Sequence, residues 1–163
     1  MKKKLIIIHG TMGVGKTTVC EKLQTRLLNS FWLDGDWCWM MNPWNFTDEN
    51  KKMVIKNITY ILKNFLKNSS THYVILSWVL HEKSIFEDLF KRLKNLDFDI
   101  VIITLCCSAE ELRKRLTKDK RDKDAIEKSI KRMPLYLKIN SEKIDTTSLS
   151  VKQTVDKIFN ILK

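Results

Sequence analysis

The sequence predicts one three-layer α/β domain, residues 1–163, built on a parallel five-stranded sheet with helices on both faces. Short apolar runs rich in β-branched residues alternate with segments whose apolar residues recur every three or four positions, as βαβ units require. A glycine-rich loop separates the first apolar run from the first helical segment. No repeat, low-complexity tract or Pro/Gly-rich linker divides the 163 residues, so a single core is expected.

Five apolar runs are predicted to be strands. The first, about residues 4–8, contains Leu5-Ile6-Ile7-Ile8 and leads directly into the glycine-rich loop. The second is short and covers about 31–33, and the others are 73–76, 100–105 and a brief run near 143–145. Because helical segments lie between all of them, we expect parallel pairing.

Helical spacing of apolar residues occurs between these strands. Ser108 with Glu111 forms a capping-box start for a helix that carries Leu112 and Leu116. The remaining helical segments are about 16–29, 48–64, 82–95 and the stretch after Ser150. Most of their apolar residues are therefore expected in the core.

The glycine-rich loop carries the clearest chemical signal. Its residues read G-T-M-G-V-G-K-T and match the phosphate-loop pattern G-x-x-x-x-G-K-[ST] at every fixed position. Glycines let successive N–H groups face inward, and the N-terminus of the following helix adds positive potential. Lys16 is expected to reach the β- and γ-phosphates, and the Thr17 hydroxyl to bind Mg²⁺. The predicted nucleoside triphosphate site comprises Gly10, Thr11, Met12, Gly13, Val14, Gly15, Lys16, Thr17 and Thr18.

Two carboxylates follow the second strand in the sequence Leu33-Asp34-Gly35-Asp36. This position is the carboxyl edge of the sheet, where open α/β sheets bind ligands. One carboxylate can hold Mg²⁺ directly or through water, and the other can accept a proton from an attacking hydroxyl or orient it. A D-G-D surface turn is the alternative interpretation.

The phosphate loop, the L-D-G-D sequence and the short chain resemble the small-molecule and nucleotide kinases of the P-loop superfamily. That group includes shikimate, adenylylsulfate and gluconate kinases, chloramphenicol phosphotransferase and nucleoside monophosphate kinases. The resemblance implies a P-loop NTPase fold with strand order 2-3-1-4-5. It also implies transfer of the γ-phosphoryl group of ATP, with Mg²⁺, to a small-molecule acceptor. A nucleotide or nucleoside ranks first as acceptor. The alternatives are an antibiotic or metabolite phosphotransferase and a regulatory ATPase without acceptor.

The same resemblance assigns roles to individual residues. Asp36 matches the catalytic, acceptor-binding aspartate, and Asp34 lies nearer the metal, together with Thr17. The loop after the fifth strand, with Thr146, is where the adenine ring is expected. In many members the third strand ends in an aspartate, but this chain has Leu76-Ser77-Trp78. Either the two aspartates carry the metal alone, or the protein binds nucleotide with reduced catalysis.

A charged segment follows the fourth strand, from Arg113 to Arg132, and residues 117–123 offer almost nothing to bury. It is either a solvated connection or a mobile flap. The resemblance implies a lid at about 117–124 that closes over the phosphates. Arginines suit this task because they stay charged and bind oxygens bidentately. The expected catalytic arginines are Arg121 and Arg132, with Arg115 next as a nucleotide-binding residue.

Aromatic residues gather in the short stretch after the first helix, and Trp78 follows the third strand. The resemblance places the acceptor pocket in the region after the second strand, where a flat or apolar acceptor could stack. A cluster that closes one edge of the core is the alternative. The residues are Trp32, Trp37, Trp39, Trp44 and Phe46.

The net charge of +11 raises the possibility of a nucleic-acid partner, including a polynucleotide 5′-hydroxyl kinase. The surplus is mostly lysine spread over helix faces, so such a partner is not expected. The four cysteines have neither zinc-ligand spacing nor disulfide density, which indicates a reducing compartment. No apolar run approaches the ~20 residues of a membrane span. We expect a cytoplasmic monomer or homodimer without membrane association.

Overall fold

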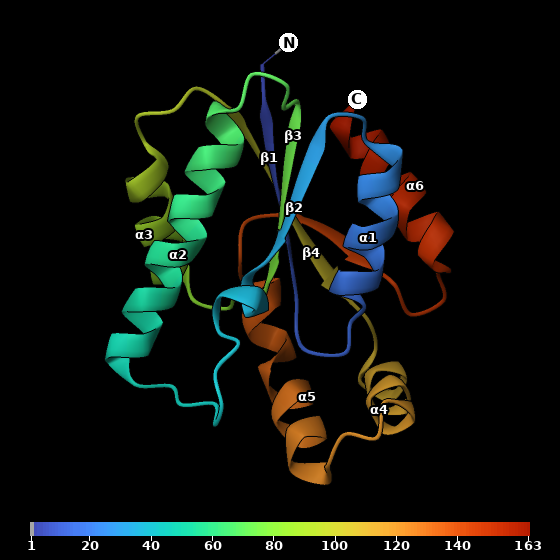
Figure 1. Cartoon of the computed structure of the whole chain (residues 1–163). Helices are drawn as coiled ribbons and strands as arrows, with labels where there is room; N and C mark the ends of the chain where they lie inside the picture. Colours follow the sequence, from blue (N-terminus) through green and yellow to red (C-terminus); the bar gives the residue numbers. More distant parts are fainter. Residues whose placement is uncertain (1) are drawn as a thin grey trace.

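Five parallel strands form the centre of the computed structural model, which describes residues 2–163 (Figure 1). Their order in the sheet is β2-β3-β1-β4-β5, and every adjacent pair is parallel. Both the predicted architecture and the predicted strand order are confirmed. The strands are β1 (Lys4–His9), β2 (Ser30–Asp34), β3 (Tyr73–Trp78), β4 (Asp99–Cys106) and β5 (Glu142–Asp145).

Helices cover both faces of the sheet (Figure 1). Helices α1 and α6 lie on one face and α2 and α3 on the other, while α4 and α5 lie beyond the carboxyl ends of the strands. The helices are α1 (Lys16–Arg26), α2 (Asp48–Lys67), α3 (Lys83–Leu93), α4 (Ala109–Lys118), α5 (Lys123–Leu137) and α6 (Val151–Leu162), with a short 3-10 helix η1 (Gly35–Cys38). In residues 2–163 no helix is both long and apolar enough to cross a membrane.

The central strand β1 shows why both faces are covered. Its four apolar residues are fully buried, and successive side chains point to opposite faces. Ile6 and Ile8 pack in the cluster with α1 and α6, whereas Leu5 and Ile7 pack in the cluster with α2 and α3. A continuous apolar run is thus required in a parallel sheet that is buried on both sides.

The first helix is shorter than its sequence pattern predicts. It ends at Arg26, because Leu27 adopts an extended conformation and Asn29 has a positive φ of 57°. The carbonyl of Asn29 then accepts a hydrogen bond from the backbone N–H of His72, at 2.8 Å. This turn reverses the chain into β2, which brings the end of β2 to the same sheet edge as the phosphate loop.

A buried histidine fixes the start of that loop. His9 is fully buried at the end of β1, and its Nδ1 donates to the carbonyl of Leu80 at 2.8 Å. Since a carbonyl only accepts, Nε2 must be the acceptor for the Thr104 hydroxyl, also at 2.8 Å. Burial lowers the pKa of His9 to about 4, so the ring is neutral at pH 7. The neutral ring joins β1, β4 and the segment after β3 directly beneath the loop.

Candidate nucleotide and acceptor site

The phosphate loop runs from β1 to α1 in a conformation that needs its glycines. Gly13 and Gly15 have φ values of 83° and 99°, which residues with a Cβ rarely adopt. A Cβ on Gly13 would also lie 2.5 Å from Cδ2 of Leu116 on α4. The loop backbone therefore packs directly on α4, in the curled form that presents N–H groups to an anion.

Lys16 begins α1 and reaches back over the loop. Its Nζ donates to the carbonyls of Gly10 and Thr11, at 3.0 Å each. Burial lowers the pKa of Lys16 to about 8, although Asp36 and Asp34 act in the opposite direction. The ammonium group thus stands between the loop and the two carboxylates, as the sequence motif implies.

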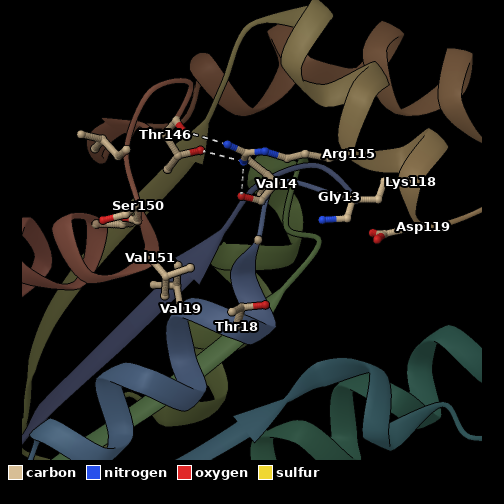
Figure 2. A pocket seen from close by; sticks show the side chains of 13 residues that line it. Gly13, Val14, Thr18, Val19, Arg115, Lys118, Asp119, Thr146, Ser150 and Val151 are labelled. Atoms are coloured by element: carbon tan, nitrogen blue, oxygen red, sulfur yellow. Dashed lines mark hydrogen bonds between the residues drawn. The ribbon is translucent and has the colours of Figure 1, made fainter.

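A cavity of about 460 Å³ adjoins the loop (Figure 2). Its walls come from the phosphate loop, the start of α1, the end of α4 and the segment that leads into α6. Figure 2 shows Lys118 and Asp119 on one side and Ser150 and Val151 on the other. Thr146 and Arg115 also line this cavity, so both predicted nucleotide-binding residues lie at one site with the loop.

Arg115 forms hydrogen bonds that the sequence did not reveal. Its Nη1 donates to the Val14 carbonyl at 3.3 Å and to the Thr146 hydroxyl at 3.1 Å, and its Nη2 donates to the Thr146 carbonyl at 2.8 Å. Nε donates to Glu111 at 2.8 Å. The guanidinium therefore ties the phosphate loop to the segment after β5 (Glu142–Asp145), and it forms a wall of the cavity. These hydrogen bonds form only because the phosphate loop, α4 and the segment after β5 come together in the fold.

Asp34 is the centre of a hydrogen-bond network at the end of β2. It is buried, with 7% of its surface exposed, and its Oδ2 accepts from the hydroxyls of Thr17 at 3.2 Å and Ser77 at 3.0 Å. Its Oδ1 accepts from the N–H of Asp36 at 3.1 Å. Trp32 Nε1 in turn donates to Ser77 at 2.9 Å. Three donors therefore hold the Asp34 carboxylate, and one of them, Thr17, belongs to the helix that follows the phosphate loop.

Asp34 lies beside the position on β3 where this chain has Ser77. Asp34 and Ser77 are direct partners in the parallel pairing of β2 with β3. A carboxylate is therefore present beside Ser77, although it comes from the neighbouring strand. The Thr17 hydroxyl and Asp34 carboxylate are hard oxygen donors of the kind that Mg²⁺ takes, and Mg²⁺ needs few protein ligands. These residues fit the ion.

Asp36 lies in η1, two residues beyond Asp34. Partial desolvation raises the pKa of its carboxyl and the Asp34 charge raises it further, whereas Lys16 and Trp78 lower it. A carboxylate with a raised pKa is a better proton acceptor than an ordinary surface aspartate. The two aspartates consequently differ in environment: Asp34 is buried and held by donors, whereas Asp36 is exposed but partly desolvated.

Gly35 is required by close packing that sequence reasoning missed. A Cβ at this position would lie 2.4 Å from Cγ of Trp78, so the indole packs on the backbone between the two aspartates. Trp78 is buried, with 8% exposed, and its Nε1 has no hydrogen-bond partner in residues 2–163. The glycine between two aspartates was visible in the sequence. The residue that makes glycine necessary there, Trp78, lies on another strand.

Replacing Gly35 with alanine is expected to destabilise the protein by about 1–3 kcal/mol, because the new methyl group overpacks against Trp78. Urea unfolding followed by circular dichroism measures this loss. Adding Trp78→Leu should make the cost of the alanine smaller than it is in the wild-type background. An alanine variant with unchanged stability would contradict the close contact.

Helix α5 brings further residues to the site. Tyr136 is buried, with 3% exposed, and its ring centroid lies 5.9 Å from those of His9 and His81. Burial raises the pKa of Tyr136 to about 12, an effect that Arg132 opposes and Asp36 strengthens. The end of α5, with Arg132 and Tyr136, therefore lies on the Asp36 side of the site.

The segment between α4 and α5 is short. Helix α4 ends at Lys118 and α5 begins at Lys123, so the two ends of the expected lid, about 117–124, are helical. Arg121 lies in the connection and is exposed, as is Arg132 on α5. Within residues 2–163 neither guanidinium forms an ion pair, whereas Arg113 pairs with Glu127 across the two helices.

The aromatic residues separate into two groups. Trp32 and Trp37 form a pair with ring centroids 5.0 Å apart. The second group, which we term the aromatic platform, is Trp39, Trp44 and Phe46. Trp39 is buried, but Trp44 is 49% and Phe46 60% exposed. The platform therefore serves partly as a core cap and partly as exposed apolar surface.

Comparison with known proteins agrees with this geometry. The AAA domain family matches residues 6–134. No curated protein matches the chain in sequence. Among solved structures, shikimate kinase from Acinetobacter baumannii superposes with a TM-score of 0.68 at 19% identity, covering 99% of this chain and 93% of that one.

Two further structures are similar. The tunicamycin resistance protein of Deinococcus radiodurans has a TM-score of 0.68 at 16% identity, covering 99% of this chain and 96% of that one. A gluconokinase from Sinorhizobium meliloti has a TM-score of 0.69 at 14% identity, covering 94% of this chain and 88% of that one. At these identities the likeness concerns the fold. The matched residues, phosphate loop included, place this chain in the AAA domain family, with the fold of the P-loop kinases.

Proposed function

We propose that this protein is an ATP-dependent kinase that transfers the γ-phosphoryl group to a small-molecule acceptor, with a nucleotide or nucleoside ranking first. The observation that carries the proposal is the convergence of Lys16, Thr17, Asp34 and Asp36 at one edge of the sheet. The Asp34 carboxylate accepts hydrogen bonds from the Thr17 hydroxyl and from the backbone N–H of Asp36. The negative charges of both aspartates raise the pKa of Lys16. A nucleotide-binding loop alone does not need the second aspartate.

Each residue has a distinct task in this proposal. The loop amides and Lys16 bind the phosphates. Thr17 and Asp34 would hold Mg²⁺, and the ion would neutralise phosphate charge. Asp36 accepts the proton of the acceptor hydroxyl. The acceptor oxygen then forms its bond to the γ-phosphorus while the bond from that phosphorus to the β,γ-bridging oxygen breaks. The electron pair of the broken bond leaves with ADP, so the catalysis is positioning and electrostatics.

The arginines complete the proposal. Arg121 and Arg132 are free of ion pairs in the described part of the chain, so either can turn toward the transferring group. Arg115 is already bonded to Val14 and Thr146 and so holds the wall of the nucleotide cavity. We therefore assign Arg115 to nucleotide positioning and the other two to charge neutralisation.

ADP release from Mg·ATP in the presence of pooled acceptors tests the function. The pools are nucleosides, nucleoside monophosphates, hydroxylated antibiotics, sugars and short oligonucleotides, with Lys16→Ala as the blank. Stimulation above the blank by one pool establishes a kinase and narrows the acceptor. If no pool stimulated ADP release although ATP still bound, the proposal would be overturned in favour of a regulatory ATPase.

Exchanging the side chains of Asp34 and Ser77 is expected to separate carboxylate chemistry from packing. Asp34→Ser should lower kcat/KM by about 10²-fold, since a metal ligand supplies several kcal/mol of charge stabilisation. Adding Ser77→Asp restores a carboxylate one strand away and should recover about tenfold. Steady-state kinetics over a magnesium titration measures both. If Asp34→Ser alone kept the wild-type magnesium dependence, Asp34 would not be a magnesium ligand.

Nucleotide binding is expected to take up protons above pH 8. The pKa of Lys16 is about 8 in the free protein, so the side chain is mostly neutral at pH 9. Bound phosphates favour the charged form and raise that pKa, which draws a proton from solvent. Affinity for ATP should therefore fall as pH rises through 8. Calorimetry in buffers of different ionisation enthalpy measures the uptake, and a buffer-independent heat at pH 9 would contradict it.

A further inference from the structure

We propose that the acceptor is an uncharged molecule that carries a flat ring system and a free hydroxyl group. The inference rests on the proposed kinase function and narrows its substrate class. It depends on two features of the structure: an exposed aromatic platform, and the absence of charged residues from residues 37–47, the segment that carries it.

The platform exposes apolar ring surface to solvent. The ring centroids of Trp39 and Phe46 lie 4.9 Å apart, those of Trp39 and Trp44 6.0 Å, and those of Trp44 and Phe46 5.9 Å. Trp39 anchors the group in the core, so Trp44 and Phe46 are held half exposed at 49% and 60%. Rings of this size are costly to leave in water, and a flat partner stacked on them removes that cost.

The platform is fixed relative to the catalytic carboxylate. The backbone N–H of Trp39 donates to the Asp36 carbonyl at 3.0 Å. The side-chain amide of Asn50 donates to the Asn45 carbonyl at 2.9 Å, which ties the segment to the first turn of α2. A ring on the platform would therefore have a defined position relative to Asp36.

The segment that carries the platform offers no cation to an anionic acceptor. Residues 37–47 contain no charged residue, in a chain where 30% of residues are charged. Lys51, the first cation after this segment, pairs with Asp48 at 3.4 Å. A phosphate on the acceptor would bring a charge of about −1.5 to −2 toward the carboxylates of Asp34 and Asp36. A phosphate held on the platform would therefore lack a pairing partner from this segment, which is unfavourable.

The free hydroxyl group of the acceptor follows from the role proposed for Asp36, which takes the hydroxyl proton. Asp36 is exposed, and its backbone carbonyl accepts from the N–H of Trp39 in the platform. A neutral hydroxyl meets this requirement without bringing a further charge to the two aspartates. Its oxygen then bonds the γ-phosphorus, and ADP leaves with the electron pair of the broken phosphorus–oxygen bond.

Three matched panels test this class. The first holds uncharged nucleosides and chloramphenicol, the second the 5′-monophosphates of those nucleosides, and the third ribose and uncharged polyols. ADP release from Mg·ATP and quenching of tryptophan fluorescence with a non-hydrolysable ATP analogue are the two readouts. We expect the first panel alone to contain a compound with both responses. Stronger responses in the second or third panel overturn this inference while leaving the kinase function intact. Silence in all three, with ATP bound, overturns both.

Variants of the platform give a second test with the best compound. Trp44→Ala should raise its KM about tenfold with kcat nearly unchanged, within the range of ring-stacking contributions. The matched control is Tyr60→Ala, which removes an aromatic ring that is 69% exposed on α2 outside the platform, and it should leave KM unchanged. Equal ATP affinity in the wild-type protein, Trp44→Ala and Tyr60→Ala shows that the nucleotide site is folded in each. An unchanged KM in Trp44→Ala would refute stacking.

Discussion

Replacing Asp36 with asparagine is expected to lower kcat by about 10²- to 10⁴-fold while ATP affinity stays near the wild-type value. The amide keeps the shape of the side chain but cannot accept the hydroxyl proton. In residues 2–163 the Asp36 carboxylate forms no hydrogen bond with the phosphate loop. Its backbone N–H, which donates to Asp34, is retained in the variant. Stopped-flow or steady-state ADP release, with nucleotide affinity from calorimetry, measures the two quantities separately.

The matched control is Asp97→Asn, which makes the same chemical change at a side chain that is 87% exposed beside Lys2. It should leave kcat unchanged. Normal turnover in Asp36→Asn would remove this residue from the proton-accepting role. A parallel loss of ATP affinity would instead place Asp36 in nucleotide binding.

Replacing Lys16 with alanine is expected to lower kcat/KM by at least about 10³-fold and to weaken ATP binding, since the ammonium contacts charge that develops during transfer. Its folded-state pKa of about 8 lies below the usual 10.5, so at neutral pH the charge is less favourable in the folded protein than in the unfolded chain. Removing it should therefore not lower the melting temperature. Kinetics and thermal unfolding on one preparation separate lost function from lost fold.

Lys22→Ala is the control for that change, because Lys22 lies on the same helix and is exposed. Its turnover and ATP affinity should match those of the wild-type protein. If Lys16→Ala retained turnover, the phosphate loop would not be the catalytic site and the proposed function would fail.

Local patterns sufficed for most of the fold. The run Leu5-Ile6-Ile7-Ile8 predicts a strand buried on both faces, and the structure has it at 0% exposure in the centre of the sheet. The strand order followed from resemblance and is confirmed. The end of α1 was not predictable from periodicity, because apolar spacing continues past Arg26 while the backbone turns at Asn29.

In the candidate site, too, some features follow from the sequence and others depend on the tertiary structure. The sequence by itself determined the phosphate loop and the paired aspartates, because their chemistry depends on residue type at fixed short spacing. Only the tertiary structure decided that Asp34 lies beside Ser77, that Gly35 lies under Trp78, and that Arg115 bonds Thr146. These contacts depend on strand register and on packing between segments far apart in the chain, and no local pattern encodes either.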